Sequence, residues 1–109
     1  MQSADKIQEK VLREIARRLV SRFAPRRILL YGSRATGNAR PDSDYDLLIV
    51  WRDESPPSPR AAMVRQALLD LGESLDIAVV TPAEYERLRN RRVHIVAVAD
   101  REGRVLHAA

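Results

Sequence analysis

The sequence predicts a small domain of mixed α/β (α+β) class, in which helices flank a small mixed β-sheet. Three observations support this. Apolar residues recur at helical spacing near the N-terminus, three short apolar runs have the length of buried strands, and a helix-capping box follows the last run. With 109 residues, of which 45% are hydrophobic, the chain can bury one core and leaves no room for a separate substrate domain. We therefore expect a single domain over residues 1–109.

The first half of the chain predicts one helix followed by two strands. The helix is expected over residues 4–22, and Pro25 helps to end it. Short apolar runs at residues 28–31 and 45–51 predict the two strands, with a Gly-Ser turn and a polar loop between them. The apolar stripe expected on the helix consists of Ile7, Val11, Leu12, Ile15, Leu19 and Val20.

A proline-rich, exposed loop at residues 53–59 then leads into a second helix. Ser58 and Pro59 suit the cap and the first turn of this helix, and Gly72 suits its end. The apolar stripe expected on it consists of Met63, Val64, Ala67, Leu68 and Leu71.

The last third of the chain predicts a third strand and a third helix. The strand is expected at residues 75–80, and the capping box Thr81-Pro82-Ala83-Glu84 starts a helix that runs to about residue 91. Residues 93–100 fit either a helix or a strand, and a turn at residues 102–104 precedes a short apolar end at residues 105–106. The two histidines, His94 and His107, have no ligand-like spacing and are expected to have surface or packing roles.

Composition excludes several classes of protein. The chain has no cysteine, so disulfides, zinc–thiolate sites and thiol catalysis are excluded, and a cytoplasmic location is expected. No apolar run reaches the ~18 residues of a membrane span, and the N-terminus lacks the apolar region of a signal peptide. The net charge is +4, but the basic residues are interspersed with acidic ones and form no continuous basic tract. Only 5% of residues are aromatic, so a nucleic-acid partner is not favoured.

The motif most relevant to function is Gly32-Ser33, followed after ten residues by Asp44-Tyr45-Asp46. Residues i and i+2 of a strand point the same way, roughly 6.5 Å apart, so Asp44 and Asp46 are expected to direct two carboxylates to one place. Carboxylate oxygens are ligands for hard divalent cations, and sites with two such cations catalyse in-line displacement at phosphorus. The glycine turn is expected to expose backbone N–H groups and the Ser33 hydroxyl to phosphate oxygens.

A third carboxylate, Asp76, stands in an otherwise apolar strand. If this strand pairs with the one that follows Asp44, Asp76 comes to lie beside the other two aspartates. Three ionised carboxylates together repel one another, so a divalent metal is the expected partner. An alternative is that Asp76 faces solvent at a strand end.

The aspartates also fit two patterns that involve no catalysis. Asp42, Asp44 and Asp46 match the start of a calcium-binding EF-hand loop, but Leu47 stands where that loop needs glycine and Asp53 where it needs glutamate. The aspartates could also cap a turn or a strand end. The preceding Gly-Ser at this spacing favours a catalytic role over both.

The segment GSRATGNARPDSDYDLLIV resembles the minimal nucleotidyltransferase group (MNT type) of the DNA polymerase β superfamily. The resemblance covers residues 28–80 well and implies a small mixed β-sheet flanked by helices. It implies that Asp44 and Asp46 hold two Mg²⁺ ions, with Mn²⁺ as an alternative, and that Asp76 holds the catalytic ion. It also implies that Ser33, with Gly32, contacts the outer phosphates of ATP, and that Arg34 contacts phosphate.

The activity implied by this resemblance is transfer of AMP from ATP to a hydroxyl group. Minimal members are often encoded beside a helical partner called HEPN, and the resemblance implies an antitoxin that adds AMP to a tyrosine of that toxin. A complex with such a partner, or a homo-oligomer, would complete the cleft. Two alternatives remain open: a non-catalytic binding module that neutralises its partner by complex formation, and a nucleic-acid binder that uses the arginines.

Overall fold

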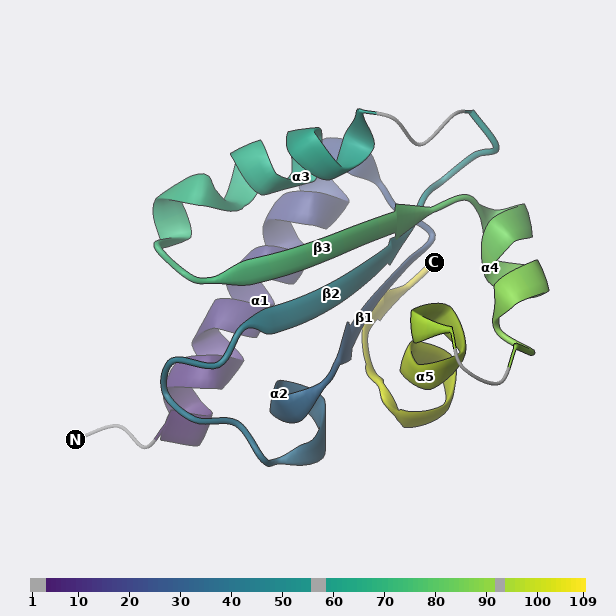
Figure 1. Ribbon diagram of the computed structural model, residues 1–109. Coiled ribbons are helices and arrows are strands. Elements are labelled where there is room, and N and C mark those ends of the chain that lie inside the picture. Colours follow the sequence, from purple (N-terminus) through teal and green to yellow (C-terminus); the bar gives the residue numbers. More distant parts are fainter. Residues whose placement is uncertain (1–3, 56–58, 92–93) are drawn as a thin grey trace.

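The protein folds into a four-stranded mixed sheet with helices on both faces, as the computed structural model shows (Figure 1). The structure describes residues 4–55, 59–91 and 94–109. The strand order is β3-β2-β1-β4; β1 is antiparallel to both β2 and β4, whereas β2 and β3 are parallel. The strands are β1 (Arg27–Tyr31), β2 (Tyr45–Val50), β3 (Leu75–Val80) and β4 (Arg104–Ala108). The helices are α1 (Ala4–Phe23), α2 (Ser33–Thr36), α3 (Arg60–Leu68) with the 3-10 turn η1 (Leu69–Leu71), α4 (Pro82–Leu88) and α5 (Ile95–Glu102).

The two faces of the sheet have separate cores. Helices α1 and α3 cover one face, where Leu12, Ile15 and Leu19 of α1 pack with Leu47 and Ile49 of β2. Helices α4 and α5 cover the other face, and the residues packed there include Leu29, Leu48, Val50, Val80, Tyr85, Val96 and Ala99. Because successive side chains of a strand point to opposite faces, the alternation along β2 assigns each residue to one of these cores.

Helix α1 begins and ends close to the predicted bounds, and Leu12, Ile15 and Leu19 are buried as expected. Ile7 is the exception, because 51% of its surface is exposed. The first turns of α1 lie beside the loop that precedes β2, where Ile7 and Gln8 line a shallow cavity with Pro41 and Tyr45.

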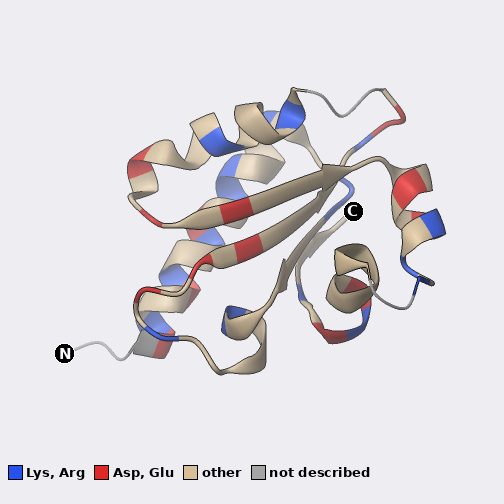
Figure 2. Ribbon diagram, viewed as in Figure 1, with Lys and Arg blue, Asp and Glu red and all other residues tan. Residues whose placement is uncertain are grey.

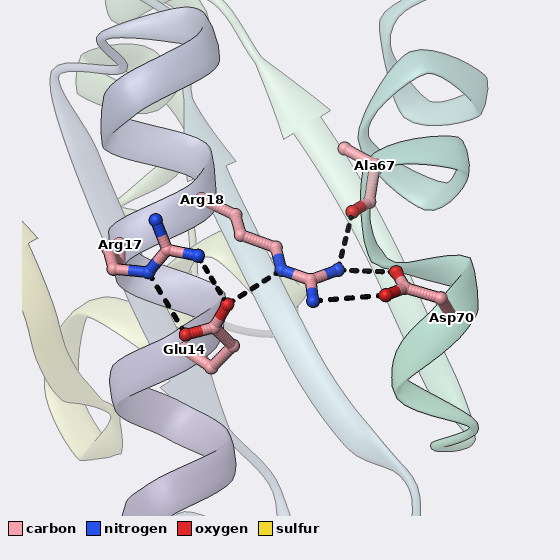
Figure 3. Close-up of polar contacts among 5 residues, drawn as sticks. All are labelled: Glu14, Arg17, Arg18, Ala67 and Asp70. Atoms are coloured by element: carbon pink, nitrogen blue, oxygen red, sulfur yellow. Dashed lines mark hydrogen bonds and ion pairs between the residues drawn. The ribbon is translucent and has the colours of Figure 1, made fainter.

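An ion-pair network ties α1 to α3 and η1 (Figure 3). Arg18 donates from Nε to Glu14 at 2.9 Å, and from its terminal nitrogens to the Ala67 carbonyl and to both oxygens of Asp70. Arg17 also donates to Glu14. Each carboxylate in this network therefore faces at least one guanidinium group.

Helix α3 corrects two expectations. Its buried residues are Arg60, Val64, Ala67 and Leu68, whereas Met63 is 44% exposed instead of buried. Along the helix the buried residues follow one another after four, three and one positions, starting at Arg60. Met63 is rotated by about 100° from Val64 about the helix axis. Arg60 is buried because its guanidinium carbon lies 4.6 Å from the centre of the Trp51 ring. Pro59, expected in the first turn, instead occupies the N-cap position before Arg60, and the predicted cap Ser58 lies outside the described residues.

The capping box before α4 is confirmed, since the Thr81 hydroxyl accepts from the Glu84 N–H at 3.1 Å and the Glu84 carboxylate accepts from the Thr81 N–H at 2.9 Å. The helix ends at Leu88, three residues before the expected position. None of the helices in the described ranges has the length and apolar character needed to cross a bilayer.

The C-terminal segment resolves the ambiguity at residues 93–100 in favour of a helix, α5, within the described residues that begin at His94. The His94 Nδ1 atom accepts from the Val96 N–H at 3.1 Å, which gives this histidine a capping role. The apolar end is longer than expected: it forms β4, which pairs with β1 and completes the sheet.

Candidate active site

The three predicted aspartates lie at the end of the sheet where β1 ends and β2 and β3 begin. Asp46 is the register partner of Tyr31 on β1 and of Asp76 on β3, so Tyr31, Asp46 and Asp76 lie in one line across three strands. We call Asp46 and Asp76, together with Asp44 beside them, the carboxylate row. Figure 2 shows the acidic segments of β2 and β3 side by side. Asp44 directly precedes β2. The pairing of the third strand with the second, on which the prediction for Asp76 depended, is confirmed.

This row of carboxylates lies on the α4/α5 face of the sheet. Asp46 shares its side of β2 with Leu48 and Val50, which pack under α4 and α5. Asp46 itself is half-buried and Asp76 is exposed. The end of the α4/α5 face that carries the two aspartates is therefore accessible to solvent and to a ligand.

The charges of the row are not compensated. Burial raises the pKa of the Asp46 carboxyl, and the negative charges of Asp76 and then Asp44 raise it further. Burial also raises the pKa of Tyr31 to about 12, with the charges of Asp76 and Asp46 adding to the effect. These shifts mark the row as a place where a cation would be stabilised.

Asp44 is held at the start of the row by the strand next to it. The Ser74 hydroxyl donates to one oxygen of Asp44, and the Tyr45 N–H donates to the Ser74 carbonyl at 2.9 Å. These two contacts join the residue before β3 to the residues that open β2. Asp44 is exposed, so its second oxygen remains accessible.

Gly32 makes the close approach that the motif requires. Its φ is +73°, in the region that favours glycine, and a Cβ at this position would lie 2.2 Å from the Asp46 Oδ2 atom. The Ala35 and Thr36 N–H groups donate to the Gly32 carbonyl, which starts the single-turn helix α2 at Ser33. A single helical turn thus follows Gly32, and Asp46 packs directly against the glycine turn.

Arg34, which is expected to contact phosphate, packs on an aromatic ring. Its guanidinium carbon lies 4.0 Å from the centre of the Tyr45 ring. Tyr45 is on the α1/α3 side of β2, whereas its neighbour Asp46 is on the α4/α5 side. The guanidinium group is therefore on the opposite side of β2 from the carboxylate row.

The donor chemistry of the row fits a hard divalent cation, since carboxylate oxygens are what Mg²⁺ prefers. Within residues 4–55, 59–91 and 94–109, however, no three His, Cys, Asp or Glu side chains are grouped closely enough to hold a metal ion. The mutual effect of the three aspartates on the pKa of Asp46 shows that they are near one another, and the register places Asp46 beside Asp76. The carboxylates are thus neighbours that have not converged on a single point.

Sequence reasoning did not single out Tyr31 as part of this region. Its position directly before Gly32, at the end of a strand that pairs with the Asp46 strand, was the available signal. It forms one side of the carboxylate row, and it packs against the α4/α5 core.

Comparison with known proteins identifies the family and agrees with the fold. The family model for the nucleotidyltransferase domain matches residues 12–105. The protein adenylyltransferase MntA of Aphanizomenon flos-aquae (strain 2012/KM1/D3) is 30% identical over 102 residues, which cover 88% of this chain and 66% of the relative. The chain thus spans slightly less than two thirds of the length of this curated relative.

Two solved structures share the fold. The crystal structure of a toxin–antitoxin with AMP-PNP matches with a TM-score of 0.62 at 18% identity, covering 89% of this chain and 73% of that chain. A putative nucleotidyltransferase from Sulfolobus solfataricus matches with a TM-score of 0.55 at 22% identity, covering 96% of this chain and 86% of that chain. These two structures show the fold, and the match of the family model over residues 12–105 shows that the chain belongs to the nucleotidyltransferase domain family, as the Gly32-Ser33 and Asp44-Tyr45-Asp46 motif predicted.

Proposed function

We propose that this protein transfers AMP from ATP to a hydroxyl group of a partner protein. The observation that carries the proposal is the row of Asp46 and Asp76, with Asp44 at its start and the Gly32 turn packed against Asp46. The relative that shares 30% identity is a protein adenylyltransferase, which supports a protein as the acceptor.

In this proposal Asp44, Asp46 and Asp76 hold two divalent cations, Mg²⁺ or Mn²⁺, and Gly32 with Ser33 receives the outer phosphates of ATP. Cations bound there would lower the pKa of the acceptor hydroxyl and neutralise charge on the leaving pyrophosphate. The protein's own part is to position the α-phosphate against the acceptor. The hydroxyl oxygen bonds to the α-phosphorus, the bond to the pyrophosphate oxygen breaks, and the hydroxyl proton passes to a carboxylate or to water.

The acceptor we propose is a tyrosine hydroxyl of a helical HEPN-type toxin, so that the transfer acts as an antitoxin reaction. Support comes from the relative's activity and from the neighbouring structure of a toxin–antitoxin with AMP-PNP. The open end of the α4/α5 face, where Asp76 is exposed, leaves access for a side chain presented by another protein.

The test is incubation with α-³²P-labelled ATP and Mg²⁺ in the presence of the candidate partner, the product of the adjacent gene. Label on the partner with wild type, and none with Asp44→Asn/Asp46→Asn, is the expected result. Mass spectrometry of the labelled partner then identifies the modified residue. A stable complex without label would contradict the proposal and favour the non-catalytic binding module.

A further inference from the structure

The side chain of Arg34 connects α2, α1 and the loop before β2 on the α1/α3 side of the sheet. Its Nε donates to the Ser43 carbonyl at 3.0 Å, and its terminal nitrogens donate to the Pro41 carbonyl at 3.2 Å and the Gln8 Oε1 atom at 3.1 Å. Every nitrogen of the guanidinium group therefore has an acceptor within the protein. These bonds use three of the five N–H donors of the group, so each of its nitrogens is anchored to a different residue.

Gln8 of α1 returns the contact. Its Nε2 donates to the Arg34 backbone carbonyl at 3.2 Å, while its Oε1 accepts from the Arg34 guanidinium. Both polar atoms of the Gln8 amide are thus used on one residue. This pair fixes α2, and the Gly32 turn from which it starts, against the first turns of α1.

The Tyr45 ring supplies a flat surface for the guanidinium group, 4.0 Å from its centre. Only 2% of Tyr45 is exposed, so the ring is fixed by the α1/α3 core. A planar guanidinium can stack on this ring and donate in its own plane at the same time, which an ammonium group cannot do. The site therefore requires arginine and not merely a positive charge.

The segment held in this way is the loop of residues 38–44 between α2 and β2. It contains one local turn, in which the Arg40 N–H donates to the Ser43 hydroxyl at 2.8 Å and the Ser43 N–H donates to the Arg40 carbonyl at 3.0 Å. Arg34 holds the Ser43 carbonyl, which belongs to the peptide group that joins Ser43 to Asp44. The position of Asp44 is therefore set from one side by Arg34 and from the other by Ser74.

We propose that Arg34 is a positioning residue that clamps the 38–44 loop and thereby fixes Asp44 for the transfer reaction, and that it is not a phosphate ligand. The catalytic part of this inference rests on the proposed function. The clamp itself is a property of the protein without metal, nucleotide or partner, and it can be measured separately.

The first measurement is hydrogen–deuterium exchange of the protein without metal and nucleotide, comparing wild type with Arg34→Lys. Arg40→Lys is the control, because it makes the same change within the clamped loop at an exposed arginine whose side chain does not hold the Ser43 carbonyl. We expect exchange at residues 38–45 to rise at least about tenfold in Arg34→Lys and not in Arg40→Lys, with core amides of β1–β3 unchanged in both. Equal protection in Arg34→Lys and wild type would overturn the clamp.

The second measurement separates kcat from the KM for ATP. A clamp predicts that Arg34→Lys lowers kcat by about ten- to a hundredfold with little change in KM, because a misplaced catalytic group slows the reaction itself. It also predicts that Gln8→Ala gives a smaller loss of the same kind. A phosphate contact predicts a different pattern. Arg34→Ala would raise the KM for ATP, Arg34→Lys would largely restore the wild-type KM, and Gln8→Ala would have no effect. If wild type transfers no AMP, the proposed function fails, and the exchange result alone decides whether Arg34 clamps the loop.

Discussion

Two charged regions of the molecule, the Arg18 network and the carboxylate row, handle acidic side chains in opposite ways. Glu14 and Asp70 face Arg17 and Arg18, and hydrogen bonds from Arg17 and then Arg18 lower the pKa of Glu14 to about 2. Asp46 faces Asp76 and Asp44, and its pKa is raised. The chain has enough arginines to pair its acids, and the proposed function accounts for the cluster left without a cationic partner among the described residues by a ligand of positive charge.

The position of each region explains the difference. The Arg18 network lies between α1 and η1, where it joins two helices of one layer. The carboxylate row lies at an open end of the other face, next to a glycine turn that has no side chain to shield it. Pairing contributes to folding in the first region. In the second region, the carboxylates repel one another in the free protein, and a bound cation would relieve this repulsion.

The largest expected effect is on catalysis by Asp46→Asn. Removing this charge takes away a shared ligand at the centre of the row, so we expect AMP transfer to fall about 10³-fold or more. Initial rates of label transfer at saturating ATP measure it. A variant with more than a tenth of the wild-type rate would contradict the assignment of the row as the active site.

A smaller effect is expected for Gly32→Ala. A positive φ costs a residue with a Cβ roughly 1–2 kcal/mol, and the new Cβ would also meet the Asp46 carboxylate. Gly37→Ala is the matched control, because Gly37 also has a positive φ, of +83°, but has nothing within 4 Å of the added atom. Urea denaturation of both should show the larger loss for Gly32→Ala, and only that variant should lose activity. Equal losses would show that the close approach to Asp46 is unimportant.

The comparison of the two regions predicts stability changes of opposite sign. In the protein without metal, Asp46→Asn removes a repelled charge and should raise the melting temperature, whereas Asp70→Asn removes a paired charge and should lower it. Thermal unfolding in the presence of EDTA measures both. Adding Mg²⁺ with ATP should raise the melting temperature of wild type and not that of Asp46→Asn. Shifts of the same sign for the two variants without metal would remove the distinction between the regions.

The smallest effect is the pH dependence of the Glu14 contribution. The pKa of Glu14 is lower in the folded protein, so its contribution to stability is present above the unfolded value of about 4.5 and is lost as pH falls towards about 2. The stability difference between wild type and Glu14→Gln should narrow over that window, and salt should reduce it because Glu14 is on the surface. A difference that is constant from pH 6 to pH 2.5 would show that the ion pairs do not contribute.

Much of the site could be predicted because its information is local in the sequence. The spacing of Asp44 and Asp46, the turn at Gly32 and the isolated Asp76 each depend on a few neighbouring residues. Once β2 and β3 are assumed to pair, Asp76 is expected beside Asp46, as the strand register shows. The reach of Asp46 towards Gly32 is a tertiary distance that no spacing reports.

The errors of prediction lie where distant contacts override local preference. Arg60 is buried because it stacks on Trp51, which shifts the buried face of α3 away from Met63. Strand β4 forms because β1 offers an edge to pair with, although its own pattern of apolar residues is short. The contacts of Arg34 with α1, the 38–44 loop and the Tyr45 ring are likewise distant ones that no local pattern reports, and its phosphate contact stays an untested prediction.

The central claim is that the carboxylate row is where cations and nucleotide bind, and paramagnetic broadening by Mn²⁺ tests it most directly. Mn²⁺ prefers the same oxygen ligands as Mg²⁺ and broadens the NMR signals of nearby amides. With a non-hydrolysable ATP analogue, broadening should centre on Gly32, Asp44, Asp46 and Asp76 in wild type and be lost in Asp46→Asn. Broadening centred elsewhere, or unchanged in Asp46→Asn, would contradict the claim.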